Sequence, residues 1–319
     1  MTDRMGMTIP LEGLPLADQA AHAAELAELG YTDLWSSEGM GADAFTPLAV
    51  ASVAAPTLRL GSAIVPVFTR GPALMAQSAA TMVATAPGRF VLGVGTSSDV
   101  IVQQWNDVTF EKPLSRTRDM VRFLRAALAG ERVDEEYDTF AVHGFRLGVV
   151  PSEPPPIVVA GLRSGMLRLA GAEADGAVIN WLSAEDVRTV APYVHEGGAD
   201  KEIVARIMVA PTTDTKLVRD MGRRLIATYL NVPVYRRFHE WLGRDDLAEM
   251  WKLWADGDRK GASASVPDRV VDELLVHGSP DECREHLARY VVNGVTTPVI
   301  SVLPFGVDMR EAVRALAPA

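Results

Sequence analysis

Residues 59–94 read RLGSAIVPVFTRGPALMAQSAATMVATAPGRFVLGV. This stretch begins with a short apolar run (59–65), continues through a longer amphipathic segment (73–85) and ends in a second apolar run (89–94). Short apolar runs rich in branched side chains indicate buried strands, whereas longer segments with apolar residues at helical spacing indicate helices. The stretch therefore predicts a strand, a helix and a second strand, the repeating unit of a parallel sheet.

The same alternation recurs about eight times along the chain. Helices are expected between the strands, and the last of them has a clear start, because Ser279 and Glu282 have the spacing of a capping box. The chain is thus predicted to be an α/β protein, a (β/α)₈ TIM barrel that forms one domain over residues 1–319. The predicted strands are 5–10, 32–37, 59–65, 89–94, 157–160, 176–179, 203–209 and 297–302.

Two segments break this rhythm. Residues 133–150 alternate polar and apolar around His143-Gly144, which predicts a β-hairpin excursion after the fourth helix. Residues 231–267 are interpreted as a helical insertion after the seventh strand. Its aromatic side chains either pack the insertion onto the barrel or line a substrate pocket, and both interpretations stay open. These side chains are Tyr235, Phe238, Trp241, Trp251 and Trp254.

Composition excludes several classes of protein. The formal net charge of −10 is opposite to that of a nucleic-acid binder, so no nucleic-acid partner is expected. Cys283 is the only cysteine, which excludes intrachain disulfides and Cys-rich metal sites, and no metal-ligand spacing occurs. The first ten residues contain no apolar signal core, and no stretch of 18 residues is apolar throughout. We therefore expect a cytoplasmic protein without membrane or metal partners.

In a (β/α)₈ barrel the carboxyl ends of the strands face one mouth, where catalysis takes place. The six histidines are expected on helices, hairpins or loops and not at strand ends, and each is interpreted as structural. A mouth with small and polar residues but few strong acids or bases suits an enzyme whose cofactor performs the difficult chemistry. The candidate mouth residues are Glu12, Glu38, Ser62, Ala63, Thr96, Ser97, Ser98, Asp99, Ala160, Gly161, Arg163, Ser164, Asn180, Trp181 and Pro304.

One turn has the features of an anion site. Gly161-Leu162-Arg163-Ser164-Gly165 opens the helix after the fifth strand. Free backbone N–H groups, the positive end of the helix and the Arg163 guanidinium could converge there on a phosphate. Glycine-containing turns of this kind are also common without a ligand, so the structural interpretation stays open.

A second glycine-rich turn follows the fourth strand. Gly93-Val94-Gly95-Thr96-Ser97-Ser98 starts like a dinucleotide fingerprint, but Ser98 stands where the third glycine belongs and no suitable acidic residue follows. A Rossmann fold is therefore rejected. The small residues Gly95, Thr96 and Ser97 instead allow close approach of a planar ring.

The residues quoted so far are similar to a known family. The resemblance is carried by the stretches GSAIVP (61–66), GPALMAQ (71–77), GRFVLGVG (88–95), GYTDLW (30–35), IVVAG (157–161) and DGA (175–177). They resemble the luciferase-like monooxygenase superfamily along nearly the whole chain. Within that superfamily, residues 105–113 together with Arg116 and Arg118 are similar to actinobacterial oxidoreductases that use coenzyme F420, a deazaflavin.

The resemblance implies a cofactor site. It implies a bulge in the third strand with a non-prolyl cis peptide at Ser62–Ala63, against the central ring of the cofactor. It also places Gly95, Thr96 and Ser97 beside the ring, the turn from Ala160 to Gly165 at the phosphate, and Asn180 in the same site. Family members commonly form homodimers across the helices near strands two to four, so a homodimer is expected.

The sequence departs from the family at two mouth positions. Dehydrogenases of this superfamily that oxidise an alcohol or a sugar phosphate commonly have Asp-His after the second strand, where this chain has Glu38-Gly39. Ser98 replaces an acidic residue common after the fourth strand, and both changes disfavour such oxidations. Glu38 or Asp99 would supply a proton if a side chain does, although Glu38 could equally be a solvated carboxylate. Arg116, Arg118 and Arg163 could hold an anionic cofactor tail.

The leading hypothesis is an F420-dependent oxidoreductase that transfers hydride to or from a carbonyl, imine or activated alkene. An alternative with the same fold is a two-component monooxygenase that uses FMN. A third hypothesis is a protein that binds a flavin or deazaflavin without turnover. The expected partners are a small-molecule substrate and a flavin or F420 reductase that supplies reducing equivalents.

Overall fold

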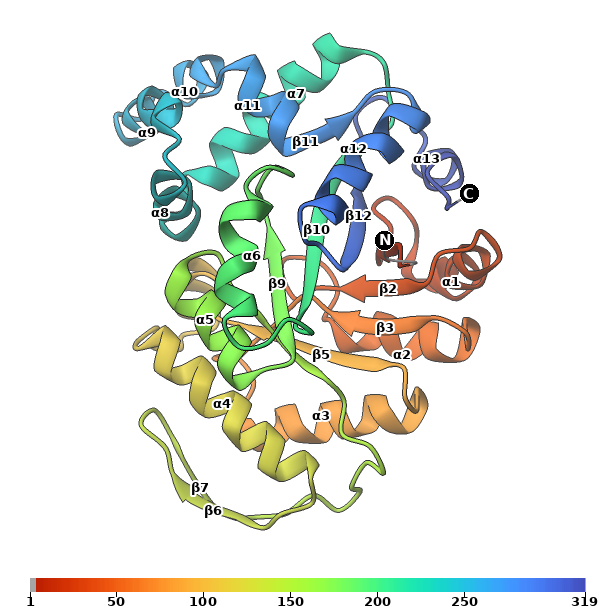
Figure 1. Cartoon of the computed structure of the whole chain (residues 1–319), viewed down its shortest axis with the longest axis vertical. Coiled ribbons are helices and arrows are strands. Elements are labelled where there is room, and N and C mark those ends of the chain that lie inside the picture. The colour runs from red at the N-terminus through yellow and green to blue at the C-terminus, as the bar shows by residue number, and fades with distance from the viewer. Residues whose placement is uncertain (1–3, 319) are drawn as a thin grey trace.

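A closed barrel of eight parallel strands forms the centre of the protein in a computed structural model that describes residues 4–318 (Figure 1). Each barrel strand pairs with the next in chain order, and the pairings of β9 with β10 and of β12 with β1 close the ring. The predicted TIM barrel is confirmed. The barrel strands are β1 (Gly6–Thr8), β2 (Asp33–Ser36), β3 (Arg59–Ser62), β5 (Phe90–Gly95), β8 (Ile157–Ala160), β9 (Gly176–Asn180), β10 (Glu202–Ala210) and β12 (Thr297–Val302).

Helices surround this ring. The helix predicted over residues 73–85 is α3 (Pro72–Thr85), and the last long helix, α12, has the predicted capping box between Ser279 and Glu282. Apart from the insertion and the helix directly after it, the other helices are α1 (Gln19–Glu28), α2 (Phe45–Ala54), α4 (Pro113–Leu128), α5 (Ser164–Glu173), α6 (Val187–His195), α7 (Thr215–Leu230), α12 (Pro280–Val292) and α13 (Met309–Ala315).

The two excursions lie at opposite ends of the molecule in Figure 1. The hairpin, β6 (Val133–Glu136) and β7 (Ala141–Phe145), is antiparallel and follows α4 as predicted. The insertion, predicted over residues 231–267, is helical and contains α8 (Pro233–Trp241), α9 (Ala248–Ala255) and α10 (Arg259–Ser265). The helix α11 (Asp268–Leu274) comes directly after it. A strand that the sequence did not predict, β11 (Leu275–His277), follows it and pairs with β10. Three residues carry too short a pattern to be recognised without their partner strand.

Side chains inside the barrel form three layers, because alternate residues of a strand point to the same face. On β10, Glu202, Val204 and Arg206 point inward, one in each layer. The middle layer is apolar and centres on Trp35, which is 1% exposed. A Cβ atom on Gly61 would lie 2.3 Å from the Trp35 ring, so only glycine leaves room for this indole. The middle layer consists of Trp35, Val91, Val158, Val178, Val204 and Val299.

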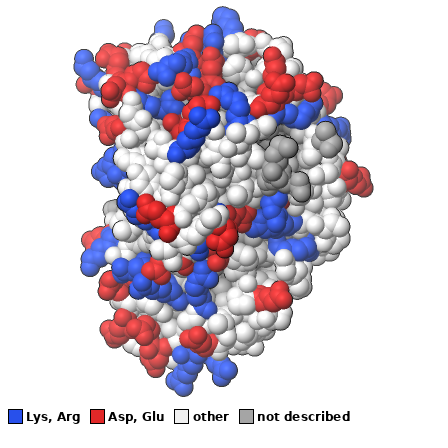
Figure 2. All heavy atoms as spheres, viewed as in Figure 1, with Lys and Arg blue, Asp and Glu red and all other residues white. Residues whose placement is uncertain are grey.

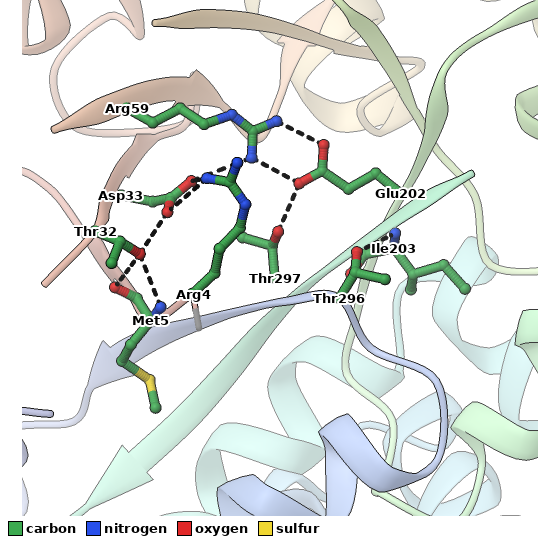
Figure 3. Close-up of polar contacts among 9 residues, drawn as sticks. All are labelled: Arg4, Met5, Thr32, Asp33, Arg59, Glu202, Ile203, Thr296 and Thr297. Atoms are coloured by element: carbon green, nitrogen blue, oxygen red, sulfur yellow. Dashed lines mark hydrogen bonds and ion pairs between the residues drawn. The ribbon is translucent and has the colours of Figure 1, made fainter. Parts of the chain in front are cut away.

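The layer at the amino ends of the strands is ionic (Figure 3). Arg59, the first residue of β3, donates to Asp33 Oδ1 at 3.2 Å and to Glu202 Oε2 at 2.6 Å. Thr297 donates to the other oxygen of Glu202. Burial raises the pKa of Glu202, but the hydrogen bond and positive charge of Arg59 outweigh burial and leave this pKa below its ordinary value. The charges at this end are therefore paired with one another.

Charged residues of both signs intermingle on the face shown in Figure 2. The formal net charge is −10, so this mixing occurs within an acidic protein. Among residues 4–318, no helix has the length and apolar character needed to cross a lipid bilayer.

Candidate active site

The mouth of the barrel, at the carboxyl ends of the strands, divides into two unlike halves. Three consecutive barrel strands, β3, β5 and β8, end in or next to the small residues Ala63, Gly95 and Ala160. The next three strands around the ring, β9, β10 and β12, carry the polar residues Asn180, Arg206 and Ser301. One half can accept a flat group closely, and the other can bind polar atoms.

The small half is tightly built. A Cβ atom on Gly95 would lie 2.9 Å from the Ala160 Cβ and 2.9 Å from Ile64 Cγ1, so the three neighbouring strands meet here without long side chains. Ala63, Ile64 and Ala160 are partly exposed toward the mouth and pack on the apolar middle layer. This surface has the shape that the sequence predicted for a planar ring.

The non-prolyl cis peptide joins Ala63 and Ile64, so the predicted position, Ser62–Ala63, is wrong by one residue. The reason is the pairing of β3 with β2. The Ala63 N–H still donates to Ser36 O at 2.6 Å, which continues the strand through Ala63. The strand is interrupted after Ala63, at the cis peptide. It resumes as β4 (Val65–Pro66), which pairs with β5.

Ser62, a predicted cofactor ligand, is the last residue of β3 and is fully buried. Its hydroxyl donates to Gly93 O and accepts from Gly93 N, both at 2.9 Å. The side chain therefore fixes β3 against β5. A contact of Ser62 with a ligand would have to come through its backbone.

The loop after β5 contains Thr96, Ser97 and Asp99, which are all half-buried. Ser97 has a φ of 59°, an uncommon conformation for a residue other than glycine, asparagine or aspartate. Such conformations concentrate at functional sites. Asp99 precedes a π-helical turn (Val100–Trp105) where the sequence predicted a polar loop. Short π-helical turns are also frequent at functional sites.

The turn into α5 matches the predicted anion site in its geometry. Arg163 is exposed and immediately precedes the helix, and no side chain caps the N–H groups of the first turn. Among residues 4–318, no acidic side chain forms an ion pair with Arg163. Gly161 is buried, and a Cβ atom there would lie 3.2 Å from Leu167 N, so glycine allows the turn to pass close to the helix. Leu162, Ser164 and Gly165 complete the turn at its surface.

The other arginines considered for the cofactor tail are already bound to protein groups. Arg116 donates to Val67 O and Thr139 O, and its guanidinium lies 4.6 Å from the centre of the Phe140 ring. Arg118 is paired with Asp119 and Asp138. Arg163 is the arginine of this set that keeps its donors available in the described part of the chain.

Glu38 lies at the mouth beside the cis peptide, and its N–H donates to Ile64 O at 3.1 Å. Its carboxylate accepts from Arg70 Nη2 at 3.0 Å, and both side chains are 20% exposed. From the sequence, Glu38 was expected to be either a proton donor or a solvated carboxylate, and this ion pair was not predicted. The ion pair with Arg70 fixes the position of the Glu38 carboxylate at the mouth.

The polar half was largely missed. Asn180 was predicted, and it donates to the hydroxyl of Tyr235 at 3.2 Å. Arg206 and Ser301 were not predicted, although Arg206 Nη2 donates to Ser301 Oγ at 2.9 Å. An arginine inside the apolar run IVARIMVA (203–210) was the available signal, because such a residue must point either into the barrel or against a helix.

The insertion contributes to both roles that the sequence left open. Phe238 and Trp251 are buried and pack it onto the barrel, with Trp251 donating to Leu230 O. Tyr235 instead reaches the mouth through Asn180. Trp181, which follows β9 with a φ of 54°, stacks on Tyr229 with ring centres 4.8 Å apart. The insertion thus builds one wall of the mouth.

The expectation that no histidine lies at the end of a strand is wrong for His277. His277 is the last residue of β11 and therefore does lie at a strand end. Its Nε2 lies 3.1 Å from Asp272 Oδ1, and Asp272 is in turn paired with Arg219. β11 pairs with residues 208–210 of β10, beyond the residues 202–206 that pair with β9, so His277 lies past the closed ring of eight strands.

The chain resembles known proteins along almost its whole length. The family model described as luciferase-like monooxygenase matches residues 2–297. A protein of Mycobacterium tuberculosis, provisionally described as a coenzyme F420-dependent oxidoreductase, is 26% identical, and the match covers 95% of this chain and 94% of that protein. A 5,10-methylenetetrahydromethanopterin reductase of Archaeoglobus fulgidus is 26% identical over 85% of each chain. The solved F420-dependent tetrahydromethanopterin reductase of Methanopyrus kandleri is 19% identical, has a TM-score of 0.82 and is matched over 98% of this chain and 97% of that chain.

Proposed function

The chain belongs to the luciferase-like monooxygenase family, and on that premise we propose that it is a coenzyme F420-dependent oxidoreductase. It transfers hydride to or from a small organic substrate, namely a carbonyl, an imine or an activated alkene. The names of two relatives that are 26% identical over most of the chain support this choice, since one is described as F420-dependent and the other acts on a methylene-bearing pterin.

The residues present fit a deazaflavin. Ala63, Gly95 and Ala160 offer a surface without long side chains, against which a ring can lie flat, and Thr96 and Ser97 border it. The uncapped first turn of α5 and the exposed Arg163 would hold a phosphate of the cofactor tail, together with Gly161, Leu162, Ser164 and Gly165. This pairing of a flat surface with an anion-binding turn is the observation that carries the proposal. When bound, the deazaflavin supplies the hydride chemistry.

Side chains at the mouth would position the substrate and exchange a proton with it. Glu38 is held at the mouth by Arg70, so its carboxylate is fixed in position. Asp99 lies at the start of the π-helical turn after β5 and is half-buried. Either carboxyl group could exchange a proton with the substrate, and Asn180 would contact the cofactor or the substrate from the polar half.

A binding titration tests the proposal. Purified protein is titrated with F420 and, separately, with oxidised and reduced FMN, and binding is followed by absorbance and fluorescence. We expect F420 to bind more tightly, and Arg163→Ala to weaken this binding at least about tenfold through loss of a charge-assisted hydrogen bond. The matched control is Arg168→Ala, because Arg168 is exposed on the same helix but paired with Glu196, and it should leave the affinity unchanged.

The other outcomes separate the alternatives. Tighter binding of FMN, with consumption of dioxygen when a flavin reductase is added, would identify a two-component monooxygenase. Tight binding of F420 without hydride exchange across a panel of ketones, imines and enones would identify a protein that only binds the cofactor. Failure of both cofactors to bind would contradict the cofactor assignment itself.

We further propose a cytoplasmic homodimer that is supplied with reducing equivalents by an F420 or flavin reductase. Large apolar side chains are exposed around α2 and α3, with Val53 80% and Leu74 51% exposed. Burial of such side chains between two copies would remove apolar surface from water. Sedimentation should give a dimer for the wild type and a monomer for Val53→Glu, whereas a monomeric wild type would contradict the dimer.

A further inference from the structure

Arg206 is a cation inside the barrel that lacks an anionic partner. It lies on β10 directly beside Asn180 of β9 in the pairing register, and two residues after the lumen-facing Val204. Among residues 4–318, no carboxylate lies within ion-pairing distance of its guanidinium. Its Nε atom is buried and has no hydrogen-bond partner, and Ser301 accepts from Nη2.

A positive charge in this position is costly, because the buried Nε–H loses its hydration without gaining a protein acceptor. Burial lowers the pKa of Arg206, which is the signature of that cost. Arginine nevertheless stays protonated in proteins. The neighbouring side chains are neutral: Asn180, Ser301, Tyr229 and Tyr235. The free protein therefore contains an uncompensated charge at the mouth.

A second arginine inside the same barrel, Arg59, has a structural role and is paired with carboxylates. Arg59 also points into the lumen, one layer below the Trp35 layer, and it donates to both Asp33 and Glu202. The two arginines lie at opposite ends of the barrel, Arg59 in the layer of Glu202 and Arg206 two layers above it, and they differ in their partners.

We infer that the polar half of the mouth is a carboxylate site, in which Arg206 binds the carboxylate of the organic substrate and Ser301, Asn180 and Tyr235 surround it. One guanidinium balances one negative charge, which fits a carboxylate monoanion better than a phosphate dianion. A guanidinium binds a planar carboxylate through two parallel N–H···O bonds, and Ser301 accepts from a single nitrogen of Arg206, Nη2, so further N–H donors remain for a ligand.

How the substrate would be oriented relative to the cofactor rests on the proposed function. In the ring of eight strands β3, which leads into Ala63, stands opposite β10, and β5 and β8 follow β3 on the way round to β9, so the small half of the mouth begins across the barrel from Arg206. A substrate whose carboxylate is held by Arg206 would therefore present its other end toward the ring of the cofactor. Arg206 would determine substrate specificity, whereas the ring surface and Arg163 would determine cofactor binding.

Ligand binding to the protein without cofactor tests the carboxylate site directly. The probes are acetate and benzoate, each compared with its neutral amide, acetamide or benzamide, and phenyl phosphate. Binding is followed by melting temperature and by intrinsic fluorescence, because Trp181, Tyr229 and Tyr235 surround the site. We expect at least one carboxylate to bind at least tenfold more tightly than its amide and than phenyl phosphate.

Three variants assign the effect to Arg206. Arg206→Gln should remove the preference for the carboxylate over the amide, Arg206→Lys should keep part of it, and Arg168→Gln should keep all of it. F420 affinity is measured in parallel and should be unchanged within about twofold in Arg206→Gln, which also shows that the variant is folded.

Equal binding of carboxylate and amide by the wild type, or an unchanged preference in Arg206→Gln, would overturn the inference. Tighter binding of phenyl phosphate would also overturn it, in favour of a phosphate site. These failures are distinct from failure of the proposed function. Absence of F420 binding contradicts the cofactor assignment but leaves the carboxylate titration of the free protein interpretable.

Discussion

Each end of the barrel contains an inward-pointing arginine, but the two arginines differ in whether carboxylates pair with them. At the amino ends of the strands, Arg59 is bound by Asp33 and Glu202. At the carboxyl ends, Arg206 donates to the Ser301 hydroxyl, and its Nε has no partner within residues 4–318. In TIM barrels the first end serves stability and the second serves catalysis. Both ends contain an arginine, so what distinguishes them is whether protein groups accept from its guanidinium donors and not the residue type.

The largest effect is expected at the ionic end. Arg59→Met should lower the free energy of unfolding by about 3–5 kcal/mol, because it leaves the partly buried Glu202 carboxylate without its cation and the buried Asp33 carboxylate with Arg4 as its remaining ion-pair partner in the described chain. Urea unfolding gives the value. The matched control is Arg122→Met, which breaks the surface pair with Glu173 and should cost about 0–1 kcal/mol. Equal costs for the two variants would show that the ionic layer is not a stabilising element.

A smaller effect is expected from pH on the mouth side, where His239 is fully buried in the insertion. Burial, followed by the nearby positive charge of Arg244, lowers the pKa of His239 from 6.5 to about 4. Between these values the unfolded chain binds a proton that the folded chain does not. The contribution is therefore fully present above pH 6.5 and is lost as the pH falls toward 4, by about 3 kcal/mol.

Unfolding curves between pH 4 and 7 test this prediction. The difference in free energy of unfolding between the wild type and His239→Gln should change across that window, because carboxylates that also titrate there are common to both proteins. A constant difference from pH 4 to pH 7 would show that His239 is protonated equally in both states.

The smallest effect has the opposite sign. Arg206→Met should raise the free energy of unfolding by about 1 kcal/mol, because it replaces an unpaired cation with an apolar side chain of similar length. Urea unfolding under the conditions used for Arg59→Met gives the comparison. If Arg206→Met is destabilised as much as Arg59→Met, then Arg206 has a structural partner and the contrast between the two ends fails.

Much of the barrel could be predicted because its strands carry local patterns. The boundaries of β8 and β12 match the predicted runs 157–160 and 297–302, and the capping box at Ser279 and Glu282 was readable from spacing alone. The strand β11 and the exact bond of the cis peptide could not be predicted. Both depend on which residues of a neighbouring strand they face, β10 in one case and β2 in the other.

The candidate site was predicted in part for the same reason. The turn from Gly161 to Gly165 and the small residues Gly95, Thr96 and Ser97 follow strands directly, so position in the chain implied position at the mouth. Arg70 and Tyr235 lie in loops and helices whose paths the sequence does not give. Their contacts with Glu38 and Asn180 join residues 32 and 55 positions apart.

By itself the sequence determined the alternation of strands and helices, the acidic character of the chain and the glycine-rich turns at the mouth, because each is a property of neighbouring residues. Only the tertiary structure decided which charges are paired. Arg59 and Arg206 both point into the barrel from their strands, but the sequence does not say which side chains each of them meets. The closure of the barrel brings Glu202 to Arg59 and, among residues 4–318, places no ion-pairing carboxylate at Arg206, because the register between strands sets which side chains share a layer.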